Sequence, residues 1–151
     1  MAAFQFNVLT HSPERLNVIS SKLGPNTATK YTDKDKKKAV KMAASANHVL
    51  CADGDELEGF IDSVEPATQD GFSFGGVARG NVGFRVEATV GAAVVTPLVF
   101  GDLVVSAGEL AVGTAGKPQV KKGTPAVHKY RVINLMTGAG VAGTTVVLEK
   151  V

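Results

Sequence analysis

The chain of 151 residues has no Trp, a single Cys, and only seven Phe and two Tyr. One cysteine, Cys51, excludes an internal disulfide and a zinc cage built from cysteines. Because Cys51 follows Val49-Leu50, we expect a small buried apolar side chain here, in preference to a reactive thiol or an intermolecular crosslink. With so few aromatic side chains, the core must consist of Val, Leu, Ile and Ala. The absence of Trp also disfavours a carbohydrate-binding module, which stacks sugars on exposed aromatic rings.

A long apolar run and an excess of one charge are missing as well. No stretch approaches the roughly 20 apolar residues of a membrane span, and the N-terminus lacks the basic-then-apolar order of a signal peptide. The formal net charge is +2, from 16 Lys and Arg against 14 Asp and Glu, too small to make nucleic acid the main partner. We therefore expect a soluble protein, synthesised in the cytoplasm, that contacts neither membrane nor nucleic acid directly.

Glycine, by contrast, is abundant, with 17 residues that show no repeating period. We detect no internal repeat. In the stretch Leu98–Gly116, short aliphatic runs are interrupted by glycine-containing turns, which is typical of strands that reverse every few residues. Similar runs predict strands at 2–9, 57–64, 72–74, 82–90, 127–135 and 144–151, and favour a strand over a helix at 36–47. About nine short strands predict an all-β fold, a compact β-sandwich or a small β-barrel.

The N-terminal part of the chain differs from the rest in charge and in apolar content. Residues 1–45 carry eight basic and three acidic side chains, whereas residues 46–151 carry eight and eleven. We predict an extended N-terminal arm at 1–35 on a β-rich body at 36–151, with a solvated tail as the alternative. Such an arm would anchor to a partner by apolar side chains, sheet-edge hydrogen bonds and lysines. The candidate partner-binding residues are Phe4, Phe6, Val8, Arg15, Lys30, Lys34, Lys36, Lys37 and Lys38.

The basic run Lys34–Lys41 contains no arginine and no aromatic ring, so it makes a poor nucleic-acid site. The segment Gly138–Gly143 matches G-x-G-x-x-G, but the eight residues after it are too few for the helix and acidic residue that dinucleotide binding requires. We expect a glycine-rich hairpin loop there. The four carboxylates of Asp53–Glu58 lie on a predicted turn and do not match the spacing of a calcium-binding loop.

Residues that could serve catalysis are scattered along the chain. The three histidines, His11, His48 and His128, lie in separate segments without ligand-like spacing. Ser106 has no base within sequence reach. A Ser-Lys dyad stays open, since its members need only meet in space. We therefore expect no enzyme, no metal and no cofactor.

Glycine-aspartate turns and short valine-rich strands follow one another in a set order between residues 36 and 151. The segments concerned are Cys51–Glu65, Asp70–Gly75, Gly101–Val104 and Val141–Glu149. In this order they resemble the small decoration, or cement, proteins of tailed-bacteriophage capsids. The resemblance implies a β-body, commonly a homotrimer, on the exterior of the virion. There it would bind the major capsid protein and stabilise contacts between neighbouring capsid subunits against internal DNA pressure.

Two other classes of protein are compatible with the sequence. Another virion structural or assembly subunit, of the tail or of head completion, would share the β-rich composition and differ in symmetry and partner. A small β-fold enzyme, such as a nucleotide hydrolase or a Ser-Lys peptidase, would need polar side chains that cluster in space. The arrangement of those side chains therefore discriminates between the classes.

Overall fold

The computed structural model describes residues 16–24, 30–65 and 73–151. These residues form ten strands and one short 3-10 helix, which confirms the all-β prediction. The strands are β1 (Leu16–Leu23), β2 (Ala39–Met42), β3 (His48–Leu50), β4 (Gly59–Glu65), β5 (Ser73–Gly80), β6 (Arg85–Val90), β7 (Leu103–Ser106), β8 (Gln119–Lys122), β9 (Tyr130–Leu135) and β10 (Thr145–Lys150), and the helix is η2 (Asp33–Asp35). In the described ranges, no helix has the length and hydropathy of a membrane span.

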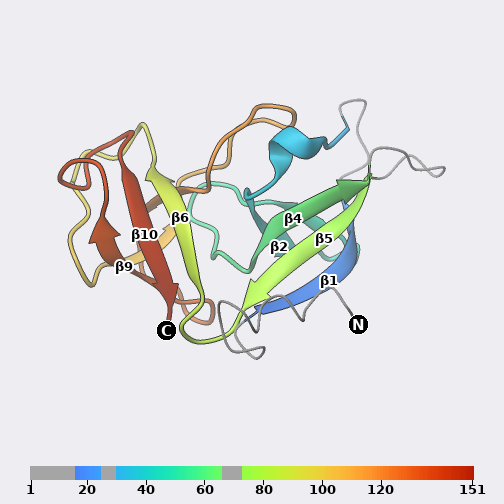
Figure 1. Cartoon of the computed structure of the whole chain (residues 1–151), viewed down its shortest axis with the longest axis horizontal. Helices are drawn as coiled ribbons and strands as arrows, with labels where there is room; N and C mark the ends of the chain where they lie inside the picture. Colours follow the sequence, from blue (N-terminus) through green and yellow to red (C-terminus); the bar gives the residue numbers. More distant parts are fainter. Residues whose placement is uncertain (1–15, 25–29, 66–72) are drawn as a thin grey trace.

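The strands form two closed five-stranded barrels that lie side by side (Figure 1). Barrel 1 consists of β1 to β5 in the order β1-β3-β2-β4-β5, and barrel 2 of β6 to β10 in the order β10-β6-β8-β7-β9. The sequence predicts the all-β class but not how the strands divide between two barrels. Closure in each case leaves few free sheet edges, which protects these short strands from unwanted pairing.

The two barrels repeat one topology. The first and third strands of each barrel are parallel neighbours, β1 with β3 and β6 with β8. All other pairings are antiparallel, and in both barrels the second strand pairs with the third and fourth, and the fifth with the fourth and first. The strands β1 to β5 therefore match β6 to β10 one for one, although no repeat is detectable in the sequence.

The match extends to individual residues. One residue of the fourth strand is skipped in its pairing with the fifth, Asp62 in β4 and Ile133 in β9, so both barrels carry a bulge at the same place. Two positions before the second strand, Lys37 and Gly101 have positive φ angles of 76° and 84°. Their N–H groups donate to the equivalent carbonyl oxygens of Ile61 and Val132 at 2.7 and 2.8 Å.

Aliphatic side chains fill both interiors, as the composition predicts. Four core positions are equivalent by strand register in the two barrels, and all eight side chains are buried. The pairs are Leu23 and Val90, Val40 and Val104, Ile61 and Val132, and Val77 and Leu148. A third apolar layer, Ala39, Cys51, Leu57 and Phe60 of barrel 1, packs against the core of barrel 2.

Strand β1 corrects the expectation of an arm that ends at residue 35. All eight residues of β1 pair with β5, and Tyr31 lies in the core of barrel 1. The described part of 1–35 therefore belongs to the body. Polar residues in β1 hide the strand in the sequence, because its pairing is set by long-range contact and not by local propensity. The predicted strand at 2–9 lies outside the described residues.

Two further strands differ from expectation. Residues 117–125, where the sequence pattern predicts no strand, contain β8, which pairs with β7 through Val120, Lys121 and Lys122. The strand expected at 82–90 begins only at Arg85, and Val82, on a turn, is 70% exposed. Alternation alone does not distinguish the turn from the strand it leads into.

The repeat predicts the effect of replacing Lys37, whose equivalent is a glycine. A non-glycine residue at positive φ costs roughly 1–2 kcal/mol, part of which the greater chain entropy of glycine offsets. We expect Lys37→Gly to raise the free energy of unfolding by about 0.5–1 kcal/mol in urea denaturation. Lys36→Gly, at a neighbouring position with φ of −55°, is the matched control and should lower it. A loss of stability in Lys37→Gly would contradict the prediction.

Candidate partner-binding surface

Four of the predicted partner-binding lysines lie around η2. Lys30, Lys34, Lys36 and Lys37 are all exposed, and we call them the η2 surface. Lys36 forms an ion pair with Asp33 at 3.0 Å. A pocket of about 490 Å³ opens here, lined by Lys30, Tyr31, Thr32, Asp33, Lys34, Val64 and Gly113. Two of these lysines, Lys30 and Lys34, line the same pocket, whereas Phe4, Phe6, Val8 and Arg15 lie outside the described residues.

Lys38 does not belong to this surface. Its side chain has no solvent exposure, and Nζ contacts a carboxylate oxygen of Asp35, also fully buried, at 2.7 Å. Nζ also donates to the carbonyl oxygen of Ala111 at 2.7 Å. The sequence places Lys38 in a uniform run of lysines, so nothing in the pattern indicates that this one is buried.

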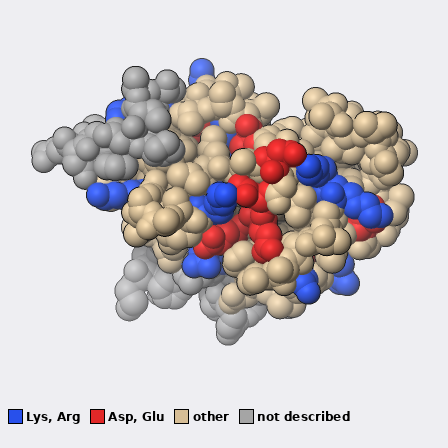
Figure 2. All heavy atoms as spheres, turned by 180° about the vertical axis from the view of Figure 1, so that it is seen from behind, with Lys and Arg blue, Asp and Glu red and all other residues tan. Residues whose placement is uncertain are grey.

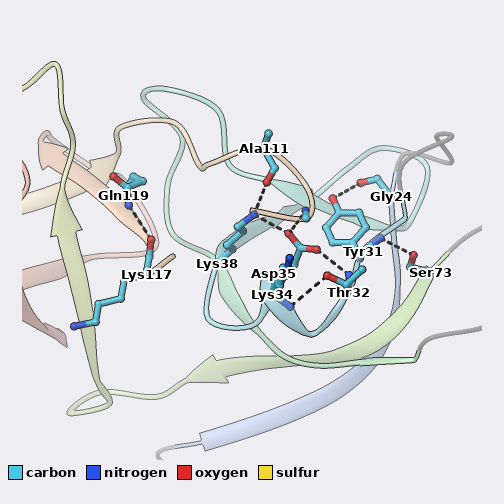
Figure 3. Close-up of polar contacts among 11 residues, drawn as sticks. Gly24, Tyr31, Thr32, Lys34, Asp35, Lys38, Ser73, Ala111, Lys117 and Gln119 are labelled. Atoms are coloured by element: carbon cyan, nitrogen blue, oxygen red, sulfur yellow. Dashed lines mark hydrogen bonds and ion pairs between the residues drawn. The ribbon is translucent and has the colours of Figure 1, made fainter. Parts of the chain in front are cut away.

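Asp35 is the centre of a compact network at η2 (Figure 3). The hydroxyl of Thr32 accepts from the N–H of Lys34, and the Asp35 carboxylate accepts from the N–H of Thr32 at 2.8 Å. This reciprocal pattern is a capping box, which satisfies the free N–H groups at a helix start. The remaining oxygen of Asp35 accepts from Lys38 and from the N–H of Gly113 at 2.8 Å.

The partners Ala111 and Gly113 come from the loop between β7 and β8, which belongs to barrel 2. Lys38 and Asp35 each bind one of them, so the network fastens this loop to η2. Gly113 also lines the pocket. The lysines of the η2 surface therefore project from a fixed backbone, and a partner that binds them orders little additional chain. Sequence reasoning gave no signal for the contribution of residues 111–113.

Glu56 makes a second connection between the barrels. Its carboxylate accepts hydrogen bonds from three successive N–H groups, those of Ala126, Val127 and His128, at 2.6, 3.1 and 2.7 Å. These bonds, led by that from His128, lower the pKa of Glu56. Beside it, Gly54 and Asp55 exchange backbone hydrogen bonds with Ser106. The acidic turn expected at 53–58 is thus a docking segment between barrels.

Acidic side chains gather across the middle of the rear face, with lysines and arginines on either side (Figure 2). The ion pairs of the docking segment follow this pattern: Lys121 with Asp53, Lys41 with Asp55, and Arg79 with Glu58. Within the described ranges no group of three or more His, Cys, Asp or Glu could hold a metal ion. The carboxylates of 53–58 form ion pairs and hydrogen bonds with other residues of the chain.

The groups that could serve nucleophilic chemistry are also engaged internally. His48 is fully buried in barrel 1, with Nδ1 2.6 Å from the hydroxyl of Ser21, and burial lowers its pKa. Ser106 is fully buried, and its hydroxyl accepts from the N–H of Gly108. Cys51 is buried as expected, its thiol donates to the carbonyl oxygen of Glu56, and burial raises its pKa. None of these three side chains is open to a substrate.

Gly138–Gly143 forms the loop between the antiparallel strands β9 and β10, as expected for a hairpin. Comparison with protein-family models, with curated protein sequences and with solved structures finds no match to this chain.

The buried pair at η2 predicts a large difference between two similar substitutions. Lys38→Met leaves Asp35 buried without its cation, so we expect unfolding free energy to fall by about 3–5 kcal/mol. Lys36→Met removes an exposed partner of Asp33 at the same spacing and should cost less than about 1 kcal/mol. Chemical denaturation of both variants measures the difference. Equal losses would show that the Lys38 pair is not specially stabilising.

The carboxyl group of Glu109, in the loop between β7 and β8, should make the free energy of unfolding depend on pH. Burial raises its pKa from 4.5 to about 7, and Oε2 has no hydrogen-bond partner among the described residues. A carboxyl group with a raised pKa contributes stability that is complete below 4.5 and is lost as pH rises through about 7. Glu109→Gln cannot ionise, so its stability relative to the wild type should increase between about pH 5 and about pH 8, by up to ~3 kcal/mol.

Urea denaturation of both proteins at each pH measures this difference, and the contribution of His48 is common to both and cancels. Glu87→Gln is the control, because Lys117 lowers the pKa of that exposed carboxyl. The stability of Glu87→Gln relative to the wild type should not increase at high pH. A constant difference between Glu109→Gln and the wild type would contradict the prediction.

Proposed function

We propose that this protein is a structural subunit of a phage head. In this role it binds the outer surface of the capsid as a decoration protein and stabilises contacts between major capsid subunits. The observation that supports the proposal is the η2 surface, a group of exposed lysines on a backbone fixed by the buried Asp35–Lys38 pair. The complementary partner is an acidic protein surface.

Physical features of the body favour a mechanical role. The barrels are joined by the hydrogen bonds of the buried Lys38 and Asp35 side chains to Ala111 and Gly113, by the three N–H groups that bind Glu56, and by a continuous apolar cluster. A subunit that holds two neighbours together must transmit force without opening, and several independent connections between barrels serve this purpose. His48, Ser106 and Cys51 are buried in structural contacts, which favours a structural role over a hydrolytic one.

The test uses empty heads of the phage that encodes this chain, assembled without its gene. Purified full-length protein should co-sediment with these heads and raise their temperature of disruption. Because exposed ion pairs are screened by salt, binding should weaken as ionic strength rises. Lys34→Glu should reduce affinity by about fivefold or more at low salt, the effect of an exposed charge worth ~1 kcal/mol.

Lys129→Glu is the matched control, a reversal of one exposed lysine on barrel 2. It should bind as the wild type does. Equal weakening by both variants would show that net charge, and not the η2 surface, governs binding. Binding to tails and not to heads would instead identify a tail subunit, and binding to neither would reject the proposal.

A further inference from the structure

The pocket at the η2 surface has walls from both barrels. Residues 30–34 lie between β1 and β2, and Val64 lies in β4 of barrel 1, whereas Gly113 lies in the loop between β7 and β8 of barrel 2. The volume of about 490 Å³ is within the range of roughly 300–1,000 Å³ that is typical of ligand sites. A pocket of this size has room for a large side chain of another molecule.

The interior of the pocket is apolar and well ordered by its contacts. Val64 is half-buried and packs against the core of barrel 1, and Tyr31 is 4% exposed. The N–H of Tyr31 donates to the hydroxyl of Ser73 at 3.1 Å, and its own hydroxyl donates to the carbonyl oxygen of Gly24 at 3.3 Å (Figure 3). Apart from the chain neighbours of Gly113, no atom of the described residues lies within 4 Å of the place that a Cβ would take there. An apolar group can therefore approach the backbone of Gly113.

The charged part of the lining is mainly basic. Lys30 and Lys34 line the pocket and are exposed, and the exposed Lys36 and Lys37 follow shortly after in the chain. Among the described residues that line the pocket, Asp33 is the acidic one, and it forms an ion pair with Lys36 at 3.0 Å. Positive charge therefore exceeds negative charge around an apolar interior.

The buried carboxylate of Asp35 holds the two walls together. It accepts from the N–H of Thr32 at 2.8 Å and from the N–H of Gly113 at 2.8 Å. Both donors belong to residues that line the pocket, one on each side of the junction between the barrels. A ligand that contacts both walls needs docked barrels, so its binding stabilises the docked arrangement.

We propose that this pocket receives a large apolar side chain from an acidic segment of a partner protein, and that carboxylates beside that side chain bind the surrounding lysines. An aliphatic or aromatic side chain gains free energy when it leaves water for the apolar interior, and the lysines attract Asp or Glu on either side of it. The inference rests on the proposed function, and it specifies the kind of capsid segment that the η2 surface would bind.

A second pocket shows why the charge at η2 matters. It has a volume of about 670 Å³ and is also largely apolar, with Lys121 and Lys122 in its lining. These two lysines form ion pairs with Asp53 and Asp102, both at 2.7 Å, so an acidic segment would have to displace carboxylates of the chain itself. Lys34, by contrast, forms no ion pair with any residue that the structure describes. The pocket at η2 is therefore the better site for an acidic segment.

Fluorescence anisotropy of a labelled pentapeptide, titrated with the full-length protein at low salt, tests the inference. The probe has a central leucine with two aspartates on each side and blocked ends. It should bind, and exchange of its leucine for serine should weaken binding by at least ~10-fold, because the apolar contact is lost. Exchange of its aspartates for lysines should abolish binding. Bound leucine peptide should also raise the melting temperature of the protein.

Val64→Asp places a carboxylate in the pocket and should weaken binding of the leucine peptide by at least ~10-fold. Val82→Asp is the matched control with the same change of charge, since Val82 is 70% exposed on the turn before β6 and does not line the pocket. It should bind as the wild type does. Thermal melting checks that both variants are folded, and the comparison of leucine and serine peptides needs no variant.

Equal affinity for the leucine and serine peptides, or no binding of either at concentrations up to ~1 mM, would overturn the inference. No heads are present in this measurement, so its failure is distinguishable from failure of the proposed function. If heads bind the protein but the peptide does not, the inference is wrong and the proposed function stands. If the peptide binds but heads do not, the proposed function is wrong and the acidic, apolar ligand of the pocket stands.

Discussion

The arrangement of the two barrels depends on the buried carboxylate of Asp35. Burying an ion is costly unless its oxygens are paired, and here Lys38 and two N–H groups supply the pairing. One of those N–H groups belongs to Gly113 of barrel 2, so the ion is satisfied only when the barrels are in contact. The folding of η2 and the docking of barrel 2 are thereby coupled, and the orientation of the surface lysines follows from both.

The duplicated barrel explains why the sequence shows so little of its own organisation. Equivalent positions share only size and burial, as at Ile61 and Val132, or share only backbone conformation, as at Lys37 and Gly101. Both constraints are met by many residue types, so two copies can diverge beyond recognition while strand order, bulge and register persist. Lys37 illustrates this divergence, because its positive φ is a conformation that suits the glycine at the equivalent position, Gly101.

The sequence predicts those strands and loops that depend on short-range residue patterns. The alternation at 82–90 and 144–151 predicts β6 and β10. The glycine spacing at 138–143 predicts the hairpin loop between β9 and β10. The sequence does not predict β1, because β1 pairs with β5, which is distant in the chain. Gly75 and Gly76 of β5 leave room for side chains of β1, and residues near β1 in the sequence give no sign of this. The η2 lysines were found by charge alone, but charge does not separate the exposed lysines from the buried Lys38, which requires three-dimensional partners.

The face of barrel 1 that contacts barrel 2 has no apolar equivalent in barrel 2. Phe60, Ala39 and Cys51 form the apolar face that barrel 1 presents to barrel 2. Their equivalents by register are Arg131, Leu103 and Gly123, and Arg131 is an exposed partner of Glu149. Burying that charged pair would cost free energy that the apolar face of barrel 1 does not. The two barrels therefore differ in chemical character at this one face, apolar in barrel 1 and charged in barrel 2.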